Sequence, residues 1–374
     1  MARLDLLPPN ATAFERSLST SIDRTPEIGA GPTELHSFKL DTPQPSVLPW
    51  LVVEYGLGAI SHYLPDLASV IEYGLRWQRV KGTPQGVAES LTWVGYAFST
   101  FYEAPLRRTR WHLYELELDR FRDNENDLAT IEAVVRLSDP ARSEFYRAWN
   151  GYNVREHDWS YSRWGDGIWG DNSGVILRPG GVKWSFGRTF DAGAHDLTEA
   201  ELTALGAWVP PVEGGSITWG PFPWTSPGLK WQSDAALSRA QIIATALLAK
   251  SCWIGIYAED GSPIGFRKAR VFRPVIYQFG GYYEAAAQTW VVASGPGANL
   301  YVEALMDFGE GEGNVARSWS ITLGGAPVGS NPAGVRWLPG AGIAGGHIVG
   351  GFQIAPATLG KTSRERFRAL LKIV

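Results

Sequence analysis

The residues that most resemble a chemical site lie in the glycine-rich segment from Asp166 to Asn172. Asp166, Asp171 and Asn172 bring oxygen ligands close together, and calcium prefers such ligands. The segment lacks the ligand spacing of an EF-hand loop, however, and Asp and Asn beside glycine are common turn formers. The same two carboxylates would suit a glycosidase only if a cleft held them at a suitable separation. We therefore expect no catalytic residue and no metal ligand here, and a cation near Asp166 and Asp171 stays an open alternative.

Neither the histidines nor the cysteine follow a metal-binding pattern. The histidines are scattered singly along the chain: His36, His62, His112, His157, His195 and His347. Zinc sites need ligands at short, regular spacing, and no cysteine stands beside these residues. The single cysteine, Cys252, lies in an apolar run, which indicates a buried, unreactive thiol. The sequence thus predicts a protein that is not an enzyme and has no cofactor.

The overall composition is that of a folded protein with protein partners. The 374 residues suffice for two or three domains, and 44% of them are hydrophobic against 19% charged. The formal net charge of −4 offers no basic surplus for nucleic acid. No apolar run reaches membrane-spanning length, and the N-terminus has no signal-peptide pattern. We expect neither a nucleic-acid nor a membrane partner.

Tryptophan is unusually common, with 17 residues, and allows two interpretations. Seven of these residues fall in one part of the chain: Trp159, Trp164, Trp169, Trp184, Trp219, Trp224 and Trp231. They would form either a platform on which sugars stack or a set of core and protein-contact residues. We favour the second interpretation, because tryptophan is enriched in protein interfaces and no polar cluster for reading a sugar accompanies it.

The N-terminal region predicts a short amphipathic helix. Thr12 and Glu15 have the spacing of a capping box, in which each side chain accepts the other's free N–H. Phe14, Leu18 and Ile22 follow at four-residue spacing and form one apolar stripe. This stripe packs either on the chain's own domain or in a bundle with partner chains, and its spacing does not separate the two.

The stretch from Leu48 to Gly95 predicts three short helices with tight turns. Pro49 suits a first helical turn, Asp66 an N-cap, and Thr83 with Pro84 a further helix start. Gly82 and Gly95 are expected to end helices. We assign five residues to the packing or capping of this unit itself: Trp50, Trp77, Thr83, Pro84 and Leu91.

The remaining pattern predicts an α+β fold, with an N-terminal helical unit followed by a small β-α-β element and a mostly-β region. Alternation around Leu116, a helix over 127–137 and a strand over 144–152 give the β-α-β element. A helix is predicted over 233–250, a β-sandwich-like module towards the end, and a basic amphipathic helix over 362–374. The expected domains are 1–110 (helical, with the N-terminal bundle helix), 111–160 (β-α-β), 161–275 (Trp/Gly-rich mixed β) and 276–374 (β-sandwich-like).

Two blocks of sequence resemble the bacteriophage tail protein I family. The first is LLPPNAT at residues 6–12, followed by Phe14, Glu15, Arg16 and Leu18. The second is LPWL at residues 48–51, followed by RWQRVKGTP at residues 76–84 and a short helix ending in glycine. The blocks occur in the family's order and at its separation, and the resemblance covers roughly the first half of the chain.

The resemblance implies a structural subunit of the baseplate wedge of a contractile-tailed bacteriophage. Such a subunit is assembled in the host cytoplasm and located in the tail baseplate of the virion. The implied partners are a larger wedge protein, in a heterotrimer, together with the central hub or spike, the sheath-initiating protein and the tail fibres. In this family N-terminal helices join a multi-chain bundle, so the expected interface residues are Phe14, Leu18 and Ile22.

Two other functional classes stay open. One is a carbohydrate-binding or carbohydrate-cleaving β module with a helical attachment domain. The other is a cytoplasmic scaffold unrelated to phage.

Overall fold

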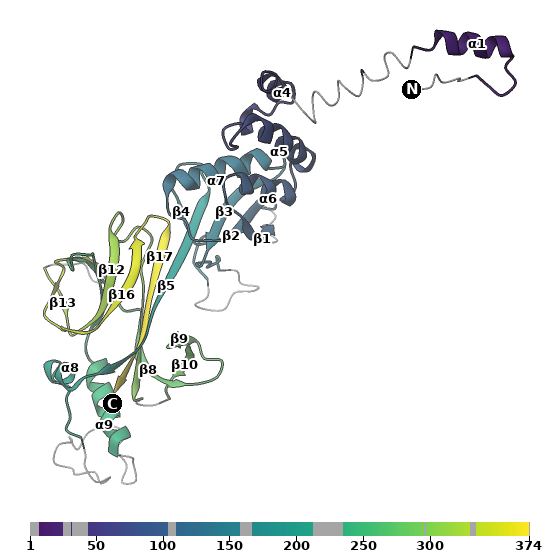
Figure 1. Ribbon diagram of the computed structural model, residues 1–374. Coiled ribbons are helices and arrows are strands. Elements are labelled where there is room, and N and C mark those ends of the chain that lie inside the picture. Colours follow the sequence, from purple (N-terminus) through teal and green to yellow (C-terminus); the bar gives the residue numbers. More distant parts are fainter. Residues whose placement is uncertain are drawn as a thin grey trace. The chain divides into compact units, whose positions relative to one another are not determined.

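The computed structural model describes residues 7–24, 31, 44–103, 110–157, 167–211, 235–294, 297–329 and 334–373. The chain divides into two compact units (Figure 1). The helical unit consists of Met1–Ala97 with Thr130–Glu144, and the β-rich unit consists of Phe98–Ala129 with Phe145–Val374. Helices dominate the N-terminal region and strands the rest, which confirms the predicted α+β class. The four predicted domain boundaries stay a prediction.

The helical unit is built from short, individually capped helices. They are α1 (Ala13–Ile22), α4 (Leu48–Glu54), the 3-10 turn η2 (Gly58–Ile60), α5 (Leu67–Val80), α6 (Pro84–Trp93) and most of α7 (Glu125–Ser138). The predicted caps are confirmed: Asp66 accepts the N–H of Ser69 at 2.8 Å, and Thr83 accepts that of Gly86 at 3.2 Å. Gly82 and Gly95 follow α5 and α6 with positive φ, a conformation that favours glycine.

The core of the helical unit collects the apolar sides of α4, η2 and α5. Its buried members are Leu51, Val52, Leu57, Ile60, Val70, Ile71 and Trp77. Trp77 packs edge-on against Trp93, with ring centroids 5.5 Å apart, and its indole N–H donates to Ser138 Oγ at 2.9 Å. The Ser138 hydroxyl in turn donates to Ser90 Oγ at 2.8 Å, so α5, α6 and α7 share one buried polar chain.

The assignment of Trp50 to this core is wrong. Trp50 is 75% exposed, whereas the next two residues of α4, Leu51 and Val52, are buried. Successive helical residues are about 100° apart, so a seven-residue helix that buries positions 51 and 52 turns position 50 away from the core. Of the other four residues in that assignment, Trp77 and Leu91 are buried, and Thr83 and Pro84 start α6.

The Ser138 hydroxyl gives the first testable prediction. Replacing Ser138 by alanine leaves the buried Trp77 N–H without its acceptor, and an unsatisfied buried donor costs about 1–3 kcal/mol. We expect the free energy of unfolding of the helical unit to fall by that amount in denaturant titrations. The control is Thr92→Ala, because the Thr92 hydroxyl bonds Glu89 O on the exposed side of α6. Equal losses in the two variants would contradict a role for the buried chain.

The β-rich unit contains two large sheets and a two-stranded one. The ten-stranded sheet comprises β1 (Phe98–Glu103), β2 (Leu113–Leu118), β3 (Glu144–Asn150), β4 (Val175–Ile176), β5 (Lys183–Leu197), β8 (Val271–Tyr277), β9 (Tyr283–Ala285), β10 (Gln288–Val292), β11 (Asn299–Leu305) and β17 (Ser363–Ile373). The five-stranded sheet comprises β6 (Cys252–Tyr257), β7 (Pro263–Lys268), β12 (Val315–Leu323), β14 (Trp337–Pro339) and β16 (His347–Thr358). The short pair is β13 (Ala326–Pro327) with β15 (Ile343–Ala344). The predicted strand–helix–strand order of β2, α7 and β3 is confirmed.

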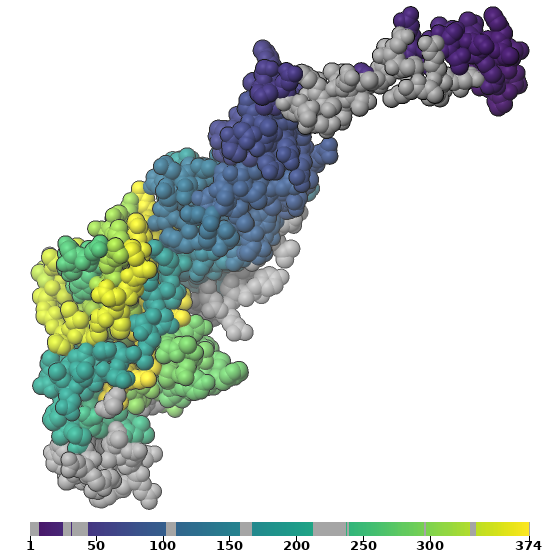
Figure 2. All heavy atoms as spheres, viewed as in Figure 1, coloured from purple at the N-terminus to yellow at the C-terminus, as the bar shows by residue number. Residues whose placement is uncertain are grey.

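The C-terminal segment is a strand, so the predicted helix over 362–374 is wrong. β17 lies inside the ten-stranded sheet, parallel to β5 and antiparallel to β11. Arg364, Arg366 and Arg368 are half-buried and alternate with the fully buried Glu365 and Phe367. This period of two is typical of a strand with one covered face, and pairing on both sides outweighs the helix propensity of its Arg, Ala and Leu residues. Figure 2 shows β17 (yellow) lying beside β5 (teal).

The two large sheets share one hydrophobic core. Phe367 of β17 meets Trp319 of β12 from the other sheet, with ring centroids 5.4 Å apart. Helix α8 (Glu199–Ala204) contributes Leu202, and α9 (Ala235–Leu248) contributes residues including Ile243 and Leu247. The core therefore joins the two sheets face to face, with α8 and α9 packed against it.

Candidate interaction surface

Helix α1 begins with the predicted capping box. The Thr12 N–H donates to Glu15 Oε2 at 2.7 Å, and the Glu15 N–H donates to Thr12 Oγ1 at 3.3 Å. The hydrogen bond from the Thr12 backbone, with that from its hydroxyl, holds the pKa of Glu15 below its usual value. The Arg16 guanidinium donates to the carbonyls of Pro8, Pro9 and Ala11, so the lead into the helix is fixed as well. This local network stabilises the start of a ten-residue helix that has no buried residue.

The apolar stripe of α1 is exposed. Phe14 is 76% exposed, Leu18 49% and Ile22 65%, and no residue of α1 is buried. Their spacing of four residues places the three side chains along one side of the helix. Isolated helices of this length are marginal in water, and helices in proteins are stabilised chiefly by burying an apolar face. Among the residues that the structure describes, none covers this face.

Besides the stripe of α1, helix α4 carries a pair of exposed apolar residues that the sequence analysis missed. Trp50 and Val53 are 75% and 74% exposed and lie three residues apart, which makes them neighbours on the helix surface. A large exposed tryptophan beside another apolar residue is typical of a protein contact. The spacing of Trp50 and Val53 places them on the same side of the helix. The sequence does not show, however, that this side is the exposed one, because that depends on which residues of α4 the core buries.

The candidate cation site contains one described carboxylate, and protein groups occupy it. Asp171 Oδ2 accepts from Lys183 Nζ at 2.6 Å. Asp171 Oδ1 accepts from the Tyr146 hydroxyl at 2.6 Å and from Arg110 at 3.0 Å. Asp166 lies outside the described residues. Within the described part of the chain, no three His, Cys, Asp or Glu side chains gather as metal ligands.

The environment of Asp171 favours its charged form. Burial raises the pKa of this carboxyl, but hydrogen bonds from Lys183, Tyr146, the Asn172 N–H and Arg110 outweigh burial and hold the pKa well below its usual range. Burial, followed by the neighbouring Asp171, raises the pKa of Tyr146. The phenol therefore stays protonated and donates to a carboxylate, which makes this cluster a set of satisfied structural contacts.

The depressed pKa of Asp171 gives a pH-dependent prediction. A carboxyl that binds its proton more weakly when folded stabilises the protein above its unfolded pKa of about 3.9, and this stabilisation is lost as pH falls through the folded pKa. We expect Asp171→Asn to flatten the fall of Tm below about pH 4. The control is Asp119→Asn, since Asp119 is similarly exposed but lies 3.8 Å from its arginine partner. An unchanged acid slope in thermal melts of Asp171→Asn would contradict the prediction.

A fully buried ionic cluster beside Asp171 was also missed from sequence. The Arg147 guanidinium donates to Ser173 O and Ser173 Oγ, each at 2.7 Å, and to Glu115 Oε2 at 3.0 Å. Asn172 Nδ2 donates to the other oxygen of Glu115 at 2.7 Å. Arg147 is 0% exposed. The cluster fastens the loop at residues 172–173 to β2 and β3.

The cysteine and the tryptophans singled out in the sequence are buried, exposed or outside the described residues. Cys252 is buried, and burial raises the pKa of its thiol, as expected for an unreactive cysteine. Trp184 is buried in the core, whereas Trp169 is exposed and packs beside His157 with ring centroids 4.8 Å apart. Five residues of the tryptophan set lie outside the described residues: Trp159, Trp164, Trp219, Trp224 and Trp231.

Among the helices described, none combines the length and the apolar character required to span a membrane.

The comparison with known families concerns the N-terminal part of the chain. Residues 7–142 match the model of a family described as Phage tail protein (Tail_P2_I). No curated protein sequence matches the chain. The matched segment contains α1 with its exposed stripe and α4 with its exposed pair. A match to this family supports a structural role in the phage tail, with a location in the virion and contacts to other tail proteins.

Proposed function

We propose, on the premise that this chain belongs through residues 7–142 to the phage tail protein family, that it is a structural subunit of the baseplate wedge in a contractile-tailed bacteriophage. It joins a larger wedge protein, in a heterotrimer, and connects to the central hub or spike, the sheath-initiating protein and the tail fibres. Its task is mechanical, and it carries out no catalysis.

The observation that carries this proposal is the exposed stripe of α1. Phe14, Leu18 and Ile22 lie on a capped helix with no buried residue, inside the segment that matches the family. Burying an apolar side chain of this size stabilises a complex by about 1.5–3 kcal/mol. A helix with one apolar stripe fits the groove between two partner helices, which would cover the stripe from both sides.

The α4 pair extends the proposed contact surface. Trp50 and Val53 are presented by a helix whose other side is anchored through Leu51 and Val52 in the core. A tryptophan on such a rigid support loses little conformational freedom on binding and is a frequent hot spot of protein interfaces. A wedge subunit needs contacts of this kind, because a baseplate that switches between two arrangements exchanges one set of buried interfaces for another.

Co-expression with the product of the adjacent large tail gene tests this function. The purified sample is measured by native mass spectrometry, and we expect a complex of fixed stoichiometry that contains this chain and the larger protein. A soluble larger partner beside a chain that stays monomeric would contradict the wedge assignment. Assembly with a partner of another class, such as a host enzyme, would contradict it as well.

A further inference from the structure

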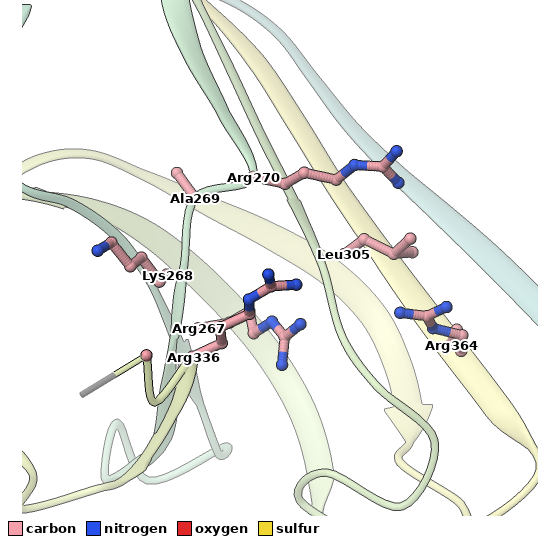
Figure 3. A pocket seen from close by; sticks show the side chains of 8 residues that line it. Arg267, Lys268, Ala269, Arg270, Leu305, Arg336 and Arg364 are labelled. Carbon is pink, nitrogen blue, oxygen red and sulfur yellow. The ribbon is translucent and has the colours of Figure 1, made fainter. Parts of the chain in front are cut away.

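A strongly basic pocket of about 520 Å³ lies in the β-rich unit. Figure 3 shows its lining side chains, which come from β7, the segment between β7 and β8, the segment that precedes β14, β11 and β17. The lining residues are Arg267, Lys268, Ala269, Arg270, Leu305, Gly334, Arg336 and Arg364. Five of these eight carry a positive charge and none is acidic.

Two of the arginines are held by carboxylates of the same unit. Arg267, although 4% exposed, pairs with Glu310 and contacts Asp307 at 3.1 Å. Arg364 pairs with Asp307 and also donates to Met306 O at 2.6 Å. These contacts fix the two guanidinium groups as walls of the pocket. They also leave more positive than negative charge, because four arginines line the pocket and two carboxylates, Asp307 and Glu310, neutralise Arg267 and Arg364. The Lys268 ammonium points away from these arginines (Figure 3).

Two further arginines are available to a ligand. Arg270 and Arg336 are exposed, and within the described residues their side chains form no hydrogen bond or ion pair. Arg336 is held next to β7, since its carbonyl accepts the Lys268 N–H at 2.8 Å. In Figure 3 the guanidinium of Arg336 lies beside that of Arg267, and those of Arg270 and Arg364 lie on the opposite side of the space. Several guanidinium groups gathered with few carboxylates create a field that attracts an anion.

The charge and the size of the pocket distinguish between kinds of anion. A carboxylate carries one negative charge, whereas a phosphate ester carries about two at neutral pH. The two arginines in excess of Asp307 and Glu310 match the charge of the phosphate ester better. Guanidinium groups donate to phosphate oxygens in pairs, and the volume falls in the range of pockets for small organic ligands. We propose that this pocket binds the phosphate group of a small organic phosphate ester, for which glucose 1-phosphate serves as a probe, with Arg270 and Arg336 as its free donors.

Titration calorimetry on the full chain tests the pocket at constant ionic strength. The probes are inorganic phosphate, glucose 1-phosphate and glucose. We expect one saturable site for glucose 1-phosphate and no binding of glucose. Inorganic phosphate should compete for the same site. Equal affinities for inorganic phosphate and glucose 1-phosphate would indicate that the site recognises the phosphate alone, whereas tighter binding of glucose 1-phosphate would indicate contacts to the sugar as well.

Charge-neutral variants locate the site. Arg270→Gln and Arg336→Gln should each weaken the binding of glucose 1-phosphate by about tenfold or more, because each removes a charge-assisted pair of hydrogen bonds. Arg273→Gln is the matched control, since Arg273 is an exposed arginine of β8 that does not line the pocket, and it should change affinity by less than about twofold.

Three results would overturn the proposal. The first is the absence of saturable binding in the folded wild-type chain. The second is an equal loss of affinity in Arg273→Gln, which would indicate a general surface effect. The third is a glutamate-rich peptide that binds the pocket without being displaced by glucose 1-phosphate, which would indicate an acidic protein segment as the occupant. Because binding is measured without tail partners, each result leaves the wedge assignment to its own test.

Discussion

Replacing Phe14, Leu18 and Ile22 together by glutamine is expected to abolish the complex that we propose between this chain and the larger tail protein. The three side chains are exposed on one helix, and each contributes about 1.5–3 kcal/mol when buried by a partner. Losing all three corresponds to more than about a thousandfold in affinity. Glutamine is a good helix former, so the variant removes the apolar stripe and retains the helix.

The matched control changes the same helix away from the stripe. Ser19 and Thr20 lie on the other side of α1, and replacing both by glutamine introduces the same side chain without changing the stripe. Co-purification and native mass spectrometry should recover the full complex with this control and only the separate chains with the triple variant. If the triple variant assembles as well as the control, α1 is not the bundle contact.

Replacing Arg147 by methionine is expected to destabilise the β-rich unit by about 3–5 kcal/mol. The substitution leaves the buried carboxylate of Glu115 without its closest cation and removes both hydrogen bonds to Ser173. Methionine fills much of the arginine volume, so the loss reports mainly on uncompensated charge and not on a cavity. Denaturant titration followed by circular dichroism measures this change in the free energy of unfolding.

Arg155 supplies the control for Arg147, because it contacts the same carboxylate from the surface. Its guanidinium lies 3.4 Å from Glu115 Oε2, but its side chain is 38% exposed. Exposed ion pairs contribute about 1 kcal/mol or less, so Arg155→Met should change the free energy of unfolding by no more than that. A similar loss in both variants would mean that burial of Arg147 does not decide its contribution.

Local signals in the sequence predicted much of the helical unit. The capping pair Thr12 and Glu15 and the helix starts at Asp66 and Thr83 are confirmed, because each depends on residues three positions apart. The stop signals Gly82 and Gly95 are local for the same reason. Trp50 was assigned wrongly because the direction in which a short helix turns its side chains depends on the core that it meets, and that core includes residues of the later helix α5.

Interactions between segments far apart in the chain could not be predicted from local sequence patterns. The residues of β17 suit a helix as well as a strand. The segment forms a strand because it pairs with β5 on one side and β11 on the other. Arg147 bonds Ser173, which lies 26 positions away, and Glu115, which lies 32 positions away. No sequence motif links these three residues. The basic pocket is similar in part: Arg267 and Arg270 stand in one short run, but Arg336 and Arg364 come from segments far from it in the sequence.

The place of β17 in the sheet sets the order in which the β-rich unit is completed. Its neighbours β5 and β11 are made earlier during synthesis, and β17 is the strand that hydrogen-bonds to both. Until residues 363–373 leave the ribosome, β5 and β11 each present an unpaired edge, and such edges promote aggregation. Translation that stops before this strand would therefore leave a chain whose large sheet has two open edges in its middle.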